Sequence, residues 1–267
     1  MLRYRTHSKT DSGDGYDSEY ESDTGTIYHP VKPIGQGHYA QARLFKSITN
    51  QAIAVLNPNK IPGDIGEAKI KQRFFRVVYP EKQSPLFIMK NDYRLVLPYI
   101  SYVPYEKLSI NTPEFQKILF RSAALALKDC HDKGIVVVDL KSDNIYYDAE
   151  TEKSYLIDGG LSTPMRSPID PLAFQKSSKQ QVDDYKREYS HIPPECWSVA
   201  PNKVVATPAM DVYCLGILMQ DLLTIPDQSI QLLIDSCLKN DPKERPTLFS
   251  LISSLEDYKL SLSIGKI

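Results

Sequence analysis

The sequence predicts an α+β protein in which a β-rich first part precedes a helical second part. Residues 34–45 alternate apolar and polar side chains after a glycine turn, and residues 52–56 form a second apolar run. Beyond residue 112, apolar residues recur at helical spacing. Between the two parts, residues 94–100 read as a buried strand that stops at a proline.

These patterns predict three regions in chain order. Residues 1–26 form a disordered acidic tail, residues 27–100 a small β-rich lobe, and residues 101–267 a helical lobe. The tail is expected because residues 11–26 carry six acidic side chains, no basic one and no aliphatic one. Sequence patterns typical of a globular fold begin only at Ile27.

Composition excludes several classes of function. A net charge of −1 gives no general attraction to nucleic acid, and no apolar run approaches the ~18 residues that a membrane span requires. The four cysteines include no C-x-x-C pair, so neither a zinc site nor a disulfide framework is indicated. We therefore expect a cytoplasmic protein without a membrane span and without a nucleic-acid partner.

The first lobe combines a glycine-rich turn with a helix. Gly35 and Gly37 would let backbone N–H groups approach phosphate oxygens, although a tight β-turn is the more common meaning of such glycines. The helix expected over residues 66–75 carries Lys69, Arg73 and Arg76 on one face. That basic stripe could bind a polyanionic activator, or it could be an ordinary solvated face.

The second lobe is expected to be built from helices with clear end signals. Thr112 caps a helix that has proline at its first position and ends near Gly134. Residues 211–223 are apolar on nearly every face, which predicts a central buried helix. A further amphipathic helix lies around residues 230–237, and Thr247 caps the last one.

A polar loop follows the apolar run that begins at Val136. Asp139 and Asn144 lie in this loop, and Asp158 follows the next strand-like run. A strand–loop–strand arrangement would bring these three side chains to one rim, and their oxygens suit Mg²⁺. The alternative is a hairpin whose Asp and Asn only satisfy turn backbone.

The order of these motifs resembles the eukaryotic-type protein kinase family, from about residue 27 to residue 260. Asp139-Leu140-Lys141-Ser142-Asp143-Asn144 is similar to the catalytic loop H-R-D-L-K-x-x-N, and Asp158-Gly159-Gly160 to D-F-G. Pro193-Pro194-Glu195 resembles A-P-E, and the resemblance implies that Glu195 pairs with Arg245. The implied fold is a bilobal kinase.

The same resemblance assigns the first-lobe residues to a nucleotide site. Gly35, Gln36 and Gly37 look like the start of the phosphate loop, and Ala42 stands where a valine usually covers the adenine. Glu67 is similar to the helix glutamate, and Leu97 to the gatekeeper.

The resemblance implies ATP and Mg²⁺ or Mn²⁺ as cofactors. Asp158 and Asn144 would hold the metal ion, and Asp139 would orient the acceptor hydroxyl and take its proton. Lys141, two residues after Asp139, is the pattern of Ser/Thr kinases and would steady the transferring phosphoryl group.

The kinase pattern fails in four places. Leu56 or Asn57 stands where the strand lysine belongs, so that lysine is expected to be lost, with Lys46, Lys60 or Lys69 as the alternatives. Valines replace the His-Arg before Asp139, and Gly159 replaces the phenylalanine of D-F-G. The short spacing from residue 211 to residue 245 predicts that the substrate-docking helix is absent.

Three functions remain open at this point. The first is an ATP- and Mg²⁺-dependent Ser/Thr protein kinase with atypical activation, which would take a protein substrate. The second is a pseudokinase that acts as a nucleotide- or partner-binding scaffold, and the third is a small-molecule kinase on a related fold. Trimmed kinases of this kind resemble those that bacterial pathogens deliver into host cells as effectors.

Overall fold

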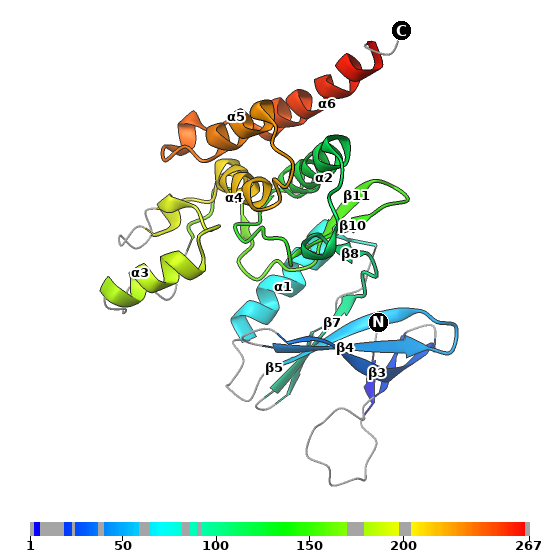
Figure 1. Ribbon diagram of the computed structural model, residues 1–267. Coiled ribbons are helices and arrows are strands. Elements are labelled where there is room, and N and C mark those ends of the chain that lie inside the picture. The colour runs from blue at the N-terminus through cyan, green and yellow to red at the C-terminus, as the bar shows by residue number, and fades with distance from the viewer. Residues whose placement is uncertain are drawn as a thin grey trace. The chain divides into compact units, whose positions relative to one another are not determined.

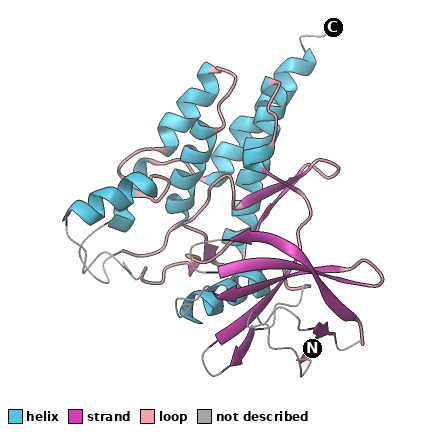
Figure 2. Ribbon diagram, turned by 60° about the horizontal axis from the view of Figure 1, so that its bottom comes forward, coloured by secondary structure: helices cyan, strands magenta, loops and turns pink. Residues whose placement is uncertain are grey.

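The computed structural model describes residues 3–5, 19–22, 25–36, 40–58, 65–81, 86–89, 92–169, 179–197 and 204–264. The chain divides into two compact units, Met1–Ser101 and Tyr102–Ile267. The first unit is mainly β-sheet and the second mainly helical, as Figure 2 shows by colour. The predicted α+β class is confirmed.

The first unit is an antiparallel sheet accompanied by one helix (Figure 1). The sheet order is β1-β2-β3-β4-β5-β7-β6, so neighbours in the sheet are mostly neighbours in the chain. Its elements are β1 (Arg3–Arg5), β2 (Glu19–Glu21), β3 (Ile27–Gln36), β4 (Ala40–Ser47), β5 (Ala52–Pro58), α1 (Ile65–Val78), β6 (Leu86–Met89) and β7 (Asp92–Pro98).

Strand β2 corrects the expectation of a disordered tail up to residue 26. Tyr20 is 1% exposed and packs edge-to-face on Phe45, with ring centroids 5.2 Å apart. The two glutamates that flank Tyr20 in β2 are only partly buried, and Glu19 pairs with His29 at 2.8 Å. The acidic composition of this segment led to the prediction of disorder. Burial of the Tyr20 ring nevertheless stabilises β2. Residues 6–18 of the expected tail lie outside the described residues.

In its described residues, the second unit contains two small sheets and five α-helices, among other elements. One sheet has the order β11-β10-β8 and the other pairs β12 with β9. The elements are β8 (Val103–Pro104), η1 (Tyr105–Lys107), α2 (Pro113–Asp132), β9 (Ile135–Val136), β10 (Ile145–Asp148), β11 (Lys153–Leu156), β12 (Thr163–Pro164), α3 (Lys179–Glu188), η3 (Pro194–Trp197), α4 (Pro208–Asp221), α5 (Gln228–Cys237), η4 (Pro242–Glu244) and α6 (Leu248–Ile264).

The predicted ends of α2 are confirmed by its caps. The Thr112 hydroxyl accepts a hydrogen bond from the backbone N–H of Phe115 at 3.1 Å, and Pro113 opens the helix. Gly134 follows the helix with φ of +76°, a conformation that glycine adopts without strain. Helix α2 thereby ends where β9 and the polar loop begin.

Helix α4 is the buried helix that the sequence predicted. Its neighbour α5 approaches so closely at Gly216 that a Cβ there would lie 2.7 Å from the Cβ of Cys237. Within residues 204–264 no helix separates α4 from α5, which agrees with the expected loss of the docking helix. Instead, the short connection ends at Asp227, which caps α5 and pairs with Lys117 at 2.8 Å. Burial opposes the charge of Asp227, but its bonds from Lys117, Ser229 and Ile230 outweigh this and lower the pKa to about 2.

The four cysteines are buried and unpaired with one another. Burial raises the pKa of the thiols of Cys196 and Cys237 to about 12, so both are protonated and unreactive at neutral pH. In the described part of the chain, no helix combines the length and the apolar character that crossing a membrane requires.

Candidate active site

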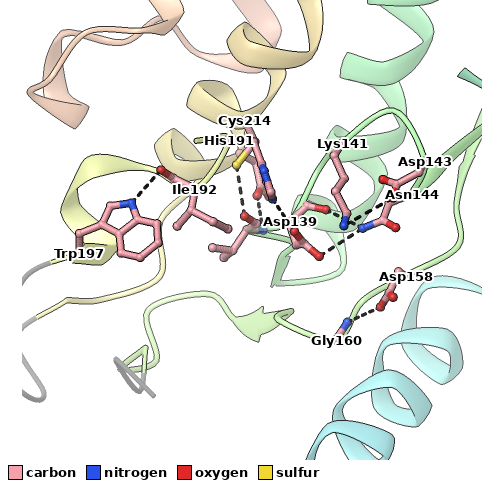
Figure 3. Close-up of polar contacts among 12 residues, drawn as sticks. Asp139, Lys141, Asp143, Asn144, Asp158, Gly160, His191, Ile192, Trp197 and Cys214 are labelled. Carbon is pink, nitrogen blue, oxygen red and sulfur yellow. Dashed lines mark hydrogen bonds and ion pairs between the residues drawn. The ribbon is translucent and has the colours of Figure 1, made fainter. Parts of the chain in front are cut away.

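The polar loop between β9 and β10 folds around the side chain of Asn144. Its amide nitrogen donates to the backbone carbonyl of Asp139 and to Oδ2 of the same residue, both at 3.2 Å (Figure 3). The backbone N–H of Asn144 also donates to the carbonyl of Lys141 at 3.0 Å. The loop therefore brings Asp139, Lys141 and Asn144 together, as the sequence predicted.

The fully buried carboxylate of Asp211, in α4, binds the backbone of the two residues that precede Asp139. Oδ2 of Asp211 accepts from the backbone N–H of Val137 at 2.8 Å, and Oδ1 accepts from that of Val138 at 2.7 Å. The ring nitrogen Nε2 of His131 lies 2.8 Å from the same carboxylate. Val138 has φ of +67°, which is strained for a β-branched residue, and Cys214 donates to its carbonyl. Asp211 and Cys214 thus hold in place the backbone that leads directly into Asp139.

The two predicted metal ligands lie at adjoining ends of paired strands. Strand β10 pairs with β11 so that Ile145 faces Leu156, and the N–H of Ile157 donates to the carbonyl of Asn144 at 2.9 Å. This register puts Asn144 next to the segment that carries Asp158. Oδ1 of Asp158 accepts from the N–H of Gly160 at 2.8 Å, which fixes the carboxylate.

The donor set fits a hard divalent cation. Because the amide nitrogen of Asn144 is used on Asp139, its oxygen is the atom left for a metal ion, and Asp158 supplies a carboxylate. One carboxylate and one amide oxygen, with further positions for water and phosphate, match the preference of Mg²⁺. At the exposed edge of the loop, Nζ of Lys141 lies 3.5 Å from Oδ2 of Asp143.

His191 contacts Asp139, a contact that the sequence reading missed. Its Nε2 lies 2.6 Å from Oδ1 of Asp139, and because a carboxylate only accepts, the ring nitrogen is the donor (Figure 3). The two residues are 52 positions apart. Only its place four residues before Glu195 could have drawn attention to it.

The predicted pair of Glu195 and Arg245 is confirmed. Two guanidinium nitrogens donate to the two carboxylate oxygens at 2.7 and 2.8 Å. Arg245 also donates to the carbonyls of Lys239 at 2.8 Å and Ala209 at 3.0 Å, and it stacks over the ring of Tyr213. This buried guanidinium joins the P-P-E segment to α4 and to the turn before α6.

In the first unit, strand register decides between the two candidates for the lost lysine. Ala42 faces Leu56, and Ala54 faces Leu97, across the β4-β5-β7 pairs. Directly opposed residues share one face of a sheet, and positions two apart along a strand do so as well. Leu56 therefore shares its face of the sheet with the two proposed adenine-site residues, Ala42 and Leu97. Asn57, the next residue in the strand, pairs with Gln41 and points to the opposite face. The register thus favours Leu56 over Asn57 as the residue at the lysine position, which stays a prediction.

The glycine-rich turn is described only in part. Gly35 pairs with Ala42 and Gln36 with Gln41, at the end of the β3-β4 hairpin. Gly37 and Lys60 lie outside the described residues. The proposed phosphate loop is thus at the expected end of the hairpin, and its role stays a prediction.

Glu67 has a lysine partner on its own helix. Nζ of Lys71 lies 2.8 Å from Oε1 of Glu67, and the two side chains are 13% and 22% exposed. Lys69 is exposed, and Lys46 donates to Asn50 in the β4-β5 turn. Lys71 was not among the lysines considered from sequence, although its i,i+4 spacing from Glu67 was the available signal.

Comparison with known proteins defines the class. The family model of the protein kinase domain matches residues 85–227, just over half of the chain, and the chain belongs to that family. Its class is that of the protein kinases, phosphotransferases that use ATP and a divalent metal ion.

Several curated proteins are similar. Mouse ribosomal protein S6 kinase alpha-2 is 26% identical over 226 residues, covering 77% of this chain and 28% of that protein. Human ribosomal protein S6 kinase alpha-3 is 28% identical over 218 residues, with 73% and 26% covered. Mouse cell division cycle 7-related protein kinase is 32% identical over 104 residues, with 38% and 18% covered.

The chain therefore spans less than a third of the length of these relatives. All three are vertebrate proteins, and the resemblance to bacterial effector kinases stays a prediction.

Proposed function

We propose that this chain is an ATP- and Mg²⁺-dependent protein kinase that phosphorylates serine or threonine hydroxyl groups. The observation that carries this proposal is the rim formed by Asp139, Asn144 and Asp158. Phosphoryl transfer depends mainly on positioning and on neutralising phosphate charge. These three side chains would position the acceptor hydroxyl and supply ligands for the metal ion that neutralises the charge. The family match and the similarity to Ser/Thr kinases support it.

Each residue has a defined part in the proposed reaction. Asp158 and the amide oxygen of Asn144 would hold Mg²⁺, which when bound neutralises charge on the phosphate oxygens. Asp139 accepts a hydrogen bond from the acceptor hydroxyl and takes its proton as the oxygen attacks the terminal phosphorus of ATP. The bond from that phosphorus to the bridging oxygen breaks, and ADP leaves. Lys141, at the exposed edge of the loop, steadies the transferring group.

Lys71 is the cation that we propose in place of the lost strand lysine. Leu56 cannot neutralise phosphate charge, and uncompensated charge away from water is costly. The side chain of Lys71 is 13% exposed and already pairs with Glu67, whereas Lys69 is exposed and Lys46 donates to Asn50. The exposed stripe of Lys69, Arg73 and Arg76 stays a predicted site for a polyanionic activator, which polyphosphate-stimulated transfer and its loss on charge reversal would test.

Phosphate transfer to a generic protein substrate tests the main proposal. With Mg²⁺ and ATP, the wild type is expected to incorporate phosphate on serine or threonine. Asp139→Asn is expected to lower kcat by about 10²–10⁴-fold, because it removes the proton acceptor. Asp158→Asn should abolish transfer. Asp132 is an exposed carboxylate in α2, and Asp132→Asn should have no effect.

A second candidate function is that of a pseudokinase, which the leucine at position 56 favours because it cannot take the part of the strand lysine. If no metal ion supports transfer while Mg-ATP raises the melting temperature, the chain is a nucleotide-binding pseudokinase. If neither is seen, the nucleotide site itself is refuted.

Binding of Mg-ATP tests the role of Lys71. Lys71→Ala is expected to weaken binding at least tenfold, corresponding to about 1.4 kcal/mol, because it removes a charge beside the phosphates. Lys46→Ala and Lys69→Ala remove the other described candidates and should leave Kd unchanged. Equal Kd values for the wild type and Lys71→Ala, measured by calorimetry, would exclude Lys71 from the site.

A further inference from the structure

The carboxylate of Asp139 is held from two directions. Asn144 donates to Oδ2 from within the loop at 3.2 Å, and His191 donates to Oδ1 from a distant segment at 2.6 Å. We propose that His191 is a positioning residue that sets the orientation of Asp139 for proton transfer. This inference rests on the proposed kinase function.

The hydrogen bond from His191 restricts the rotation of the Asp139 carboxylate and still leaves it able to accept a further hydrogen bond. A carboxylate oxygen has two acceptor sites, so Oδ1 and Oδ2 each keep one for the acceptor hydroxyl. With one donor on each oxygen, the group cannot rotate about its Cβ–Cγ bond without breaking a hydrogen bond. The side chains of His191 and Asp139 are 11% and 17% exposed, so solvent replaces either bond poorly.

The backbone that carries His191 is itself fixed. The N–H of Ile192 donates to the carbonyl of Tyr189 at 3.0 Å, and the indole N–H of Trp197 donates to the carbonyl of Ile192 at 3.2 Å. Glu195 is bound by the buried guanidinium of Arg245. The imidazole therefore reaches Asp139 from a backbone that hydrogen bonds hold on both sides of it, which favours a positioning role.

The loop itself supplies few other means of orienting Asp139. The two residues before it, Val137 and Val138, are apolar, and their backbone N–H groups are used on Asp211. Side chains that hold Asp139 must then come from later in the sequence. Asn144 and His191 are the donors that the described residues provide.

Kinetics of three variants test the positioning role. His191→Phe, which keeps a ring but donates nothing, is expected to lower kcat by about 10- to 100-fold with KM for ATP unchanged, since a misplaced group loses transition-state contacts only. His191→Gln keeps an N–H donor and should therefore recover most of kcat, which a merely structural role of the ring would not explain. His29→Gln breaks the His–Glu pair at β2 and β3 and should leave both kcat and KM for ATP unchanged.

A double-mutant cycle in unfolding separates the contact from the activity. His191→Phe and Asp139→Asn should be non-additive in the free energy of unfolding, as expected for residues in contact. Additive effects, or an unchanged kcat in His191→Phe, would overturn the proposal even in an active kinase. If the wild type transfers no phosphate although the cycle shows coupling, the kinase function is refuted and the contact is purely structural, which overturns the positioning role as well.

Discussion

Replacing Arg245 with methionine is expected to lower the free energy of unfolding by about 3–5 kcal/mol. The guanidinium is fully buried, and its loss leaves the carboxylate of Glu195, 18% exposed, without its bidentate partner. The carbonyls of Lys239 and Ala209 would also lose their donors. Breaking a buried pair in this way costs more than the pair itself contributes, because the remaining charge is uncompensated. Urea unfolding followed by circular dichroism measures the loss.

Two companion variants make the interpretation specific. Glu195→Gln in the Arg245→Met background should restore part of the stability, since it removes the unpaired charge. Lys243→Ala, an exposed lysine two residues from Arg245, should change the stability by less than about 0.5 kcal/mol. A loss below about 1 kcal/mol in Arg245→Met would show that solvent reaches Glu195 and replaces the guanidinium.

Replacing Asp211 with asparagine is expected to reduce both stability and phosphate transfer. The carboxylate accepts from the backbone N–H groups of Val137 and Val138 on its two oxygens. An amide places an NH₂ group against one of those donors, and each buried group left unsatisfied costs about 1–3 kcal/mol. Val138, released from φ of +67°, would relax toward the allowed region and displace Asp139. A shift of about 1 Å can cost ~10²-fold in rate, so kcat should fall by about that factor.

Unfolding and kcat must be measured on the same protein preparations. Asp235→Asn, an exposed residue in α5 that accepts from Gln231, serves as the control and should change neither quantity. If Asp211→Asn loses stability but keeps kcat, Asp211 only holds the fold and does not aim Asp139. If it keeps both, the carboxylate does not constrain Val138.

The candidate site was predictable where its parts lie close together in the chain. Asp139, Lys141 and Asn144 lie within one loop, and strand pairing places Asp158 beside it, so the order of residues nearly determines the geometry. The pair of Glu195 and Arg245 was also predicted, from family resemblance alone. Tyr20 was misjudged because composition averages over a segment and gives one buried ring too little weight.

By itself, the sequence determined the class of fold and the residues of the proposed metal-binding rim, because alternation, helix caps and a short polar loop act over a few residues. Only the tertiary structure decided which partners complete the site. His191 reaches Asp139 across 52 residues, and Asp211 reaches Val137 across 74, and no local pattern encodes either contact. The strand register likewise favours Leu56 over Asn57 at the position of the strand lysine, because a shift of one residue exchanges the two faces of a sheet.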